Sequence, residues 1–162
     1  MKFMEHRGGG IIILSFILAL SLTIIPLPNM IEGLRPEFVS LTLIYWCMAL
    51  PNRIGLGSAW TAGIFLDVMR DTLLGQHALA LTLVAFFILQ LHQRIRVFPL
   101  WQQAISIGVM ILIQIALVLW IKGIMSEKAD FWVALLPVLT TSLFWPPTFL
   151  LMRYLRRYYQ VS

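Results

Sequence analysis

The stretch VFPLWQQAISIGVMILIQIALVLWI, at residues 97–121, contains no Asp, Glu, Lys or Arg. A helix needs about 20 consecutive, mostly apolar residues to cross the hydrocarbon core of a bilayer. Trp101 and Trp120 stand near the two ends of this stretch. On a helix they would be about 28 Å apart, and tryptophan is enriched at membrane interfaces. We therefore predict a membrane-spanning helix at about 99–121.

The rest of the chain has the same character. Its 162 residues are 60% hydrophobic and 12% charged, whereas about 25% of the residues of a soluble domain are charged. This composition argues against a disordered chain, a disulfide scaffold, a nucleic-acid-binding domain and most soluble enzymes. Cys47 is the single cysteine, so no intramolecular disulfide can form.

Other uncharged intervals extend this interpretation to the whole chain. Residues 8–31, 72–93 and 131–152 are long enough to span alone, whereas 38–52 and 54–66 need flanking residues. Pro51-Asn52-Arg53 separates the last two and predicts a tight hairpin between them. We predict one all-α integral membrane domain over 1–162, a compact bundle of six transmembrane helices; four spans plus a re-entrant hairpin is the alternative. The predicted spans are about 9–27, 36–50, 53–69, 73–92, 99–121 and 131–152.

Lys and Arg predict the orientation. With six spans, the side that holds both termini carries eight of these residues and the opposite side carries four. The side with more Lys and Arg faces the cytoplasm, so we predict a multi-pass protein of the cell inner membrane with both termini cytoplasmic. The eight are Lys2, Arg7, Arg53, Arg94, Arg96, Arg153, Arg156 and Arg157, and the four are Arg35, Arg70, Lys122 and Lys128.

Small residues recur at helical spacing in the third predicted span. Gly55, Ala59 and Gly63 are four residues apart, and Asp67 follows at the same spacing. Small residues at this spacing let a second helix approach closely in lipid. The neighbour is either another helix of this chain, which we favour, or a helix of a partner.

Charged residues gather where the second span begins and the third ends. Arg35-Pro36-Glu37 opens the second span, 17 residues before Asn52 in the case of Arg35, and Asp67 lies 15 residues after Asn52. A hairpin would bring Arg35 and Asp67 to similar depth, and the cost of an unpaired charge near hydrocarbon predicts an ion pair. This patch is a structural ion pair, an outward cavity that receives a partner or a small ligand, or both.

No set of residues suggests catalysis. The chain has no G-x-S-x-G, no H-E-x-x-H and no phosphate-binding loop. His6, His77 and His92 are too far apart for a compact metal motif. We expect a protein that is not an enzyme, with no cofactor and no metal. Since topology accounts for the basic charge, nothing calls for a nucleic-acid partner.

An ordered set of motifs resembles the family of the rod shape-determining membrane protein MreD, over nearly the whole chain. Arg70-Asp71 departs from the small or uncharged residues that relatives often carry after L-D. The motifs, in chain order, are Arg35-Pro36, Pro51-Asn52-Arg53, the glycines from Gly55 to Gly63, Leu66-Asp67, Leu74-Gly75 with Ala78-Leu79, LWQQA at 100–104 and FLLMRYLRR at 149–157.

The resemblance implies a non-enzymatic scaffold of the bacterial cell-wall elongation machinery that helps to maintain rod shape. The implied partners are an MreC-like protein, MreB-like filaments, a RodA-like synthase and the elongation-specific penicillin-binding transpeptidase, besides membrane lipids. It also implies a fold similar to the substrate-capturing subunits of energy-coupling-factor transporters. We assign structural or partner-binding roles to Arg35, Pro36, Glu37, Gly55, Ala59, Gly63, Asp67 and Gly75.

A small-ligand-binding subunit of a transporter is the alternative function. The vitamin-capturing subunits often carry A-x-x-x-A in their first span, where they dock to the transporter. The first span here has Ser15, Ala19 and Thr23 at that spacing, and A-x-x-x-A occurs nowhere in the chain. This difference favours the scaffold.

Overall fold

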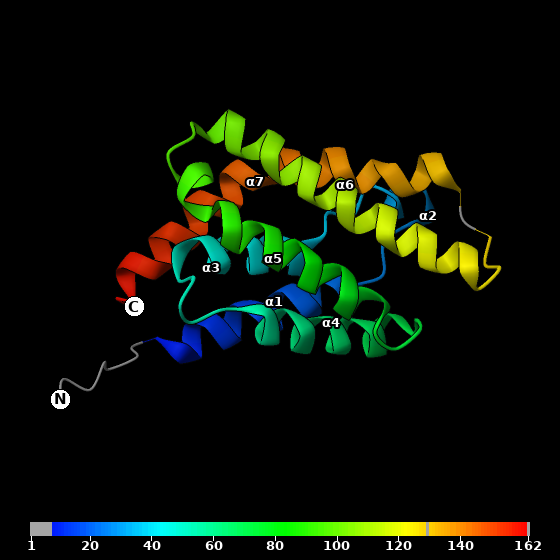
Figure 1. The fold of residues 1–162 in the computed structure, drawn as a ribbon, viewed down its shortest axis with the longest axis horizontal. Coiled ribbons are helices and arrows are strands. Elements are labelled where there is room, and N and C mark those ends of the chain that lie inside the picture. Colours follow the sequence, from blue (N-terminus) through cyan, green and yellow to red (C-terminus); the bar gives the residue numbers. More distant parts are fainter. Residues whose placement is uncertain (1–7, 129, 162) are drawn as a thin grey trace.

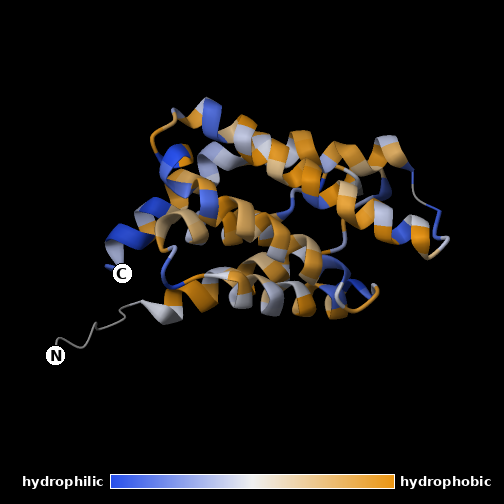
Figure 2. Ribbon diagram, in the orientation of Figure 1, coloured by the Kyte–Doolittle hydropathy of each residue, from blue (hydrophilic) through white to orange (hydrophobic). Residues whose placement is uncertain are grey.

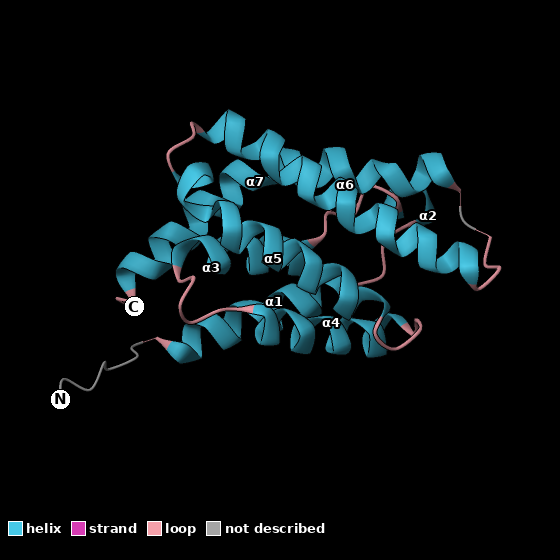
Figure 3. Cartoon of the chain, in the orientation of Figure 1, coloured by secondary structure: helices cyan, strands magenta, loops and turns pink. Residues whose placement is uncertain are grey.

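The computed structural model describes residues 8–128 and 130–161, and all regular structure in these residues is helical (Figures 1 and 3). Proline and glycine mark many of the helix boundaries: α3 follows Pro36, α6 follows Pro99, and Gly75 precedes α5 with a φ of 100° that favours glycine. The helices are α1 Gly9–Ile24, α2 Asn29–Glu32, α3 Phe38–Ala49, α4 Leu56–Arg70, α5 Gln76–Arg96, α6 Leu100–Ile124 and α7 Phe131–Tyr158.

The uncharged helix α3 lies at the centre of the bundle. Every residue from 39 to 48 is buried, because α1, α5 and α7 surround this helix. A helix that is apolar on all sides is stable only when it is enclosed in this way. Its few polar groups are paired: Trp46 Nε1 donates to Ser15 Oγ at 2.9 Å, and Ser40 Oγ donates to Gln114 Oε1 at 2.7 Å.

Each predicted span coincides with a helix, but the helices differ in length. In the described chain α5, α6 and α7 have 21, 25 and 28 residues and are long and apolar enough to cross a membrane. The outward side chains of α7 include Leu139 and Leu143, which are 67% and 77% exposed, and such a surface suits lipid rather than water. The apolar helices α1 and α3 have 16 and 12 residues, so α3 is only about 18 Å long.

The predicted hairpin of the second and third spans is wrong. Helix α4 packs most closely on α5 and touches α1, whereas α3 packs on α1, α5 and α7 (Figure 1). The segment 50–55 therefore connects two helices that are not each other's main neighbours. The turn at Pro51-Asn52-Arg53 marks the end of a helix correctly, but a turn does not determine which helix the next one packs against.

The bundle has two ends, which we name by their contents. The terminal end holds the beginning of α1 and the end of the chain, where Gly8 lies against Val161 (Figure 1). The acidic end holds the last turns of α1, α4 and α6 and the first turns of α3, α5 and α7. Both ends are hydrophilic and the middle of the bundle is apolar (Figure 2).

Candidate functional site

Asp67, from the last turn of α4, caps the first turn of α5. Its side chain is fully buried. Its Oδ2 accepts the backbone N–H groups of Gly75 at 2.9 Å and Ala78 at 3.3 Å, and its Oδ1 accepts that of His77 at 2.8 Å. The first N–H groups of a helix have no partner inside the helix, and the helix dipole favours a negative charge there. The Leu66-Asp67 and Leu74-Gly75 motifs therefore meet at one helix cap.

A chain of side chains leads from this cap to the surface. His77 Nδ1 lies 2.8 Å from Asp67 Oδ1, and His77 Nε2 lies 3.2 Å from Arg70 Nη1. Since a carboxylate only accepts and a guanidinium only donates, these partners fix a neutral imidazole with its proton on Nδ1. Arg70 also pairs with Glu37 at 3.3 Å, and the side chains of these two residues are 27% and 12% exposed. Thr72 Oγ1 donates to Asp67 Oδ1 at 3.0 Å.

The predicted ion pair between Arg35 and Asp67 is wrong. Arg35 donates from Nη1 to the backbone O of Thr23 and from Nη2 to that of Ile25, where α1 ends. The last carbonyls of a helix lack partners and attract a cation, as its first N–H groups attract an anion. Arg35 therefore caps the end of α1 and Asp67 caps the beginning of α5. The predicted pair also required an α3–α4 hairpin that would bring the two side chains together, and α3 and α4 do not form one. Pro36, next to Arg35, is buried.

A polar cavity of about 480 Å³ lies at the acidic end. Arg35, Arg70 and Lys122 bring three cationic side chains to its wall, against the single carboxylate of Glu37. Among the side chains that the structure describes, no carboxylate lies within ion-pair distance of Lys122, and Arg35 Nε is buried without a hydrogen-bond partner. The cavity therefore has an excess of positive charge suited to an anionic group. Thr23, Gly33, Met69, Thr72, His77, Val133 and Pro137 also line it.

The Asp67–His77 pair is built as a structural element rather than as a catalytic dyad. In a dyad the second imidazole nitrogen faces a nucleophile, but here Nε2 faces Arg70 and both carboxylate oxygens are occupied by donors. The described residues contain no group of three His, Cys, Asp or Glu side chains that could hold a metal ion.

The small residues of α4 serve contacts inside the chain. A Cβ on Gly63 would lie 2.2 Å from the Cα of Ala78, so α4 and α5 touch backbone to backbone at this position. Ala59 is fully buried, whereas a Cβ on Gly55 would meet nothing within 4 Å. The sequence allowed either a helix of this chain or a helix of a partner against this face. In the structure the neighbour is α5 of the same chain.

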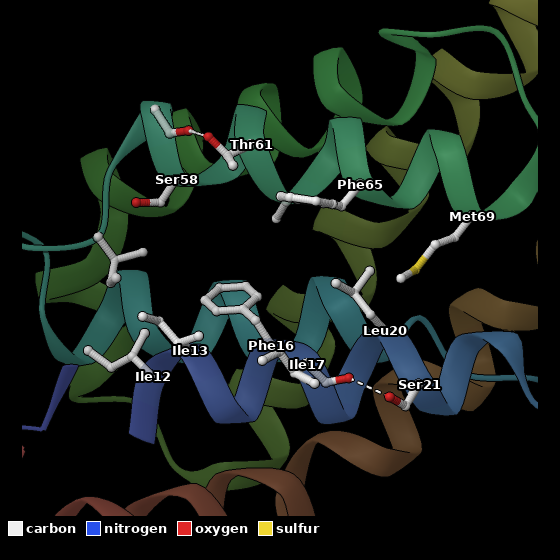
Figure 4. Close-up of a pocket in the computed structure, with 13 residues that line it drawn as sticks. Ile12, Ile13, Phe16, Ile17, Leu20, Ser21, Ser58, Thr61, Phe65 and Met69 are labelled. Atoms are coloured by element: carbon white, nitrogen blue, oxygen red, sulfur yellow. Dashed lines mark hydrogen bonds between the residues drawn. The ribbon is translucent and has the colours of Figure 1, made fainter. Parts of the chain in front are cut away.

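The opposite face of α4 is open. An apolar groove of about 690 Å³ separates it from α1, and Figure 4 shows Phe65 and Met69 of α4 across the groove from Phe16 and Leu20 of α1. Two hydroxyl groups in the groove bond within their own helices: Ser21 donates to the backbone O of Ile17 at 2.8 Å, and Thr61 donates to that of Gly57 at 2.8 Å. The groove therefore presents few free polar groups, as suits a surface in contact with lipid.

Sequence reasoning found Arg35, Glu37, Asp67 and Gly75 but missed two members of the site. His77 enters the prediction only as one of three histidines that are too far apart for a metal motif. Lys122 was counted only as a loop charge. The signal for His77 was its position two residues after Gly75, in the first turn of the helix that Asp67 caps.

Comparisons with known proteins agree with one another. The family model described as rod shape-determining protein MreD matches residues 4–155. The chain is also similar to the rod shape-determining protein MreD of Haemophilus influenzae (strain ATCC 51907 / DSM 11121 / KW20 / Rd). The two are 30% identical over 142 residues, which cover 88% of each chain. No solved structure matches the chain significantly.

Proposed function

The chain belongs to the rod shape-determining protein MreD family, and from that premise we propose that it is a non-enzymatic membrane scaffold of the bacterial cell-wall elongation machinery. In this role it holds an MreC-like protein and, through it or beside it, a RodA-like synthase, the elongation-specific penicillin-binding transpeptidase and MreB-like filaments. The engaged Asp67–His77 pair supports a role without catalysis.

We propose the six-span arrangement in the inner membrane with both termini cytoplasmic. Helices α1, α3 and α4 then cross with the help of the residues that flank them. Two observations support this arrangement: the excess of Lys and Arg on the side of the termini, and the apolar middle of the bundle between two hydrophilic ends (Figure 2). The acidic end then faces outward.

The cavity at the acidic end is the proposed contact with the MreC-like protein. The observation that carries this proposal is the excess of cationic groups there, with Lys122 unpaired in the described chain and the Arg70 charge already shared with Glu37. An acidic side chain of the partner would enter a site that is already formed and would neutralise its excess positive charge. Complementary charge at an interface gives specificity and faster association.

A comparison of two lysines tests this contact. Lys122 lines the cavity, while Lys128 is exposed in the loop that follows and does not line it. We expect Lys122→Glu to reach the membrane at the normal level, to capture less MreC-like protein and to give round cells. Lys128→Glu makes the same charge change, so cells that carry it should stay rod-shaped.

Two outcomes would change the assignment. If Lys122→Glu and Lys128→Glu both gave rods and normal capture, the cavity would not be the partner site. If Lys122→Glu rounded the cells while capture of the MreC-like protein stayed normal, the cavity would serve a small anionic ligand instead. Its volume of about 480 Å³ fits that second function, since ligand sites are commonly about 300–1,000 Å³.

A further inference from the structure

A second polar cavity lies at the opposite, terminal end of the bundle, between α3, α5 and α7. It has a volume of about 260 Å³. Arg96, Arg153 and Arg156 bring three guanidinium groups to its wall, and the buried Tyr45 and the ring of Phe149 form part of its apolar side. The two rings meet edge to face with centroids 5.8 Å apart, so this wall is fixed by packing.

The arginines of this cavity have no acidic partner in the described chain. Arg96 donates to the backbone O of Met48, which holds its guanidinium against the end of α3. Arg153 and Arg156 form no ion pair within residues 8–128 and 130–161. The acidic side chains that the structure describes belong to the other end of the bundle: Glu37, Asp67, Asp71, Glu127 and Asp130.

The depth of the cavity matches the headgroup layer of a membrane. Phe149, Arg153 and Arg156 follow one another at i, i+4 and i+7 on α7, which places them on one face of the helix. Phe149 belongs to the segment predicted to cross the hydrocarbon. The two arginines lie about 6 and 10 Å further along the axis at 1.5 Å per residue, and the headgroup layer on each side is about 5–8 Å thick. The cavity therefore reaches from the edge of the hydrocarbon into the headgroups.

We propose that this cavity binds the phosphate of an anionic phospholipid headgroup. Guanidinium groups bind phosphate through paired hydrogen bonds, and basic pockets between transmembrane helices bind anionic headgroups. Arginines that only fix the topology need not line a common cavity, and Arg94 and Arg157 at the same end of the bundle lie outside this one. The proposal goes beyond the scaffold role and does not depend on which partner occupies the acidic end.

Lipid binding to the full-length chain, purified in a neutral detergent, tests the proposal by native mass spectrometry. The probes are phosphatidylglycerol, phosphatidylcholine and inorganic phosphate. The test variant is Arg153→Ala with Arg156→Ala, and the matched control is Arg94→Ala with Arg157→Ala, which removes the same charge outside the cavity. A third variant, Arg153→Lys with Arg156→Lys, keeps the charge but loses the paired donors of the guanidinium. Equal melting temperatures in detergent establish that all variants are folded.

We expect the unchanged chain to retain phosphatidylglycerol but not phosphatidylcholine. The Arg153/Arg156 alanine variant should bind phosphatidylglycerol about thirtyfold more weakly. The affinity of the lysine variant should lie between those of the alanine variant and the unchanged chain, and the affinity of the Arg94/Arg157 control should match that of the unchanged chain. Equal losses in the test and control variants would overturn the proposal, because general charge would then explain binding. Displacement of the lipid by inorganic phosphate would assign the site to a free anion. If the test variant lost binding of a polyglutamate peptide but kept phosphatidylglycerol, the cavity would be a protein-docking site.

Discussion

The two faces of α4 are built for opposite purposes. On the side of α5, Gly63 brings two backbones into contact and Asp67 caps the neighbouring helix. On the side of α1, Thr61 and Phe65 border an apolar groove of about 690 Å³ (Figure 4). One helix therefore has a closed face, which packs against α5, and an open face, which borders the groove.

This difference shows how a pattern of small residues should be interpreted in a membrane chain. The four-residue spacing of Gly55, Ala59 and Gly63 is typical of close helix packing, but it does not distinguish a partner's helix from the chain's own. Because α5 occupies most of this face, we place the partner contact at the cavity of the acidic end instead. Substitutions on the two faces of α4 should then change the stability of the protein by different amounts, and even in opposite directions.

The largest effect is expected at Asp67. Asp67→Asn keeps the shape of the side chain but turns an NH₂ group toward backbone N–H groups that need an acceptor. Removal of one partner from such a buried network costs about 3–5 kcal/mol. We expect a large fall in folded protein in detergent, measured by thermal unfolding.

Asp71→Asn is the matched control for this variant. Asp71 is exposed and has a φ of 53°, a conformation that asparagine tolerates well. Its effect should stay within about 0.5 kcal/mol. If Asp67→Asn and Asp71→Asn unfolded at the same temperature, the cap of α5 would contribute nothing to stability and the description of the closed face would be wrong.

Substitution of the glycines of α4 should change stability less than Asp67→Asn does, and in opposite directions at Gly63 and Gly57. Gly63→Ala puts a methyl group into the backbone of Ala78, and overpacking of this kind costs about 1–3 kcal/mol. Gly57→Ala, on the open face, meets nothing within 4 Å; it should be neutral or stabilise the helix by up to about 1 kcal/mol. Unfolding in a denaturing detergent series compares the two. Equal stability of the two variants would mean that α4 and α5 do not approach as closely as described.

The sequence predicts the helices well and their neighbours poorly. Uncharged intervals place every long helix, because the length of an apolar run is a local property; α6 follows from residues 97–121 alone. The ion pair of Arg35 with Asp67 failed because spacing gives the depth of a residue but not the side of the helix that it faces. Sequence reasoning also paired side chains with side chains, whereas both charges are satisfied by backbone groups at helix ends.

The orientation of the bundle is the claim on which the outward cavity rests, and cysteine labelling in intact cells tests it most directly. Cys47 is fully buried, so a membrane-impermeant maleimide should label only the single cysteine that is introduced. Met30 and Leu74, at the acidic end, are 93% and 64% exposed. We predict that Met30→Cys and Leu74→Cys react from outside the inner membrane, whereas Arg157→Cys reacts only after that membrane is disrupted. Labelling of Arg157→Cys in intact cells, or protection of Leu74→Cys while Met30→Cys reacts, would contradict the six-span orientation.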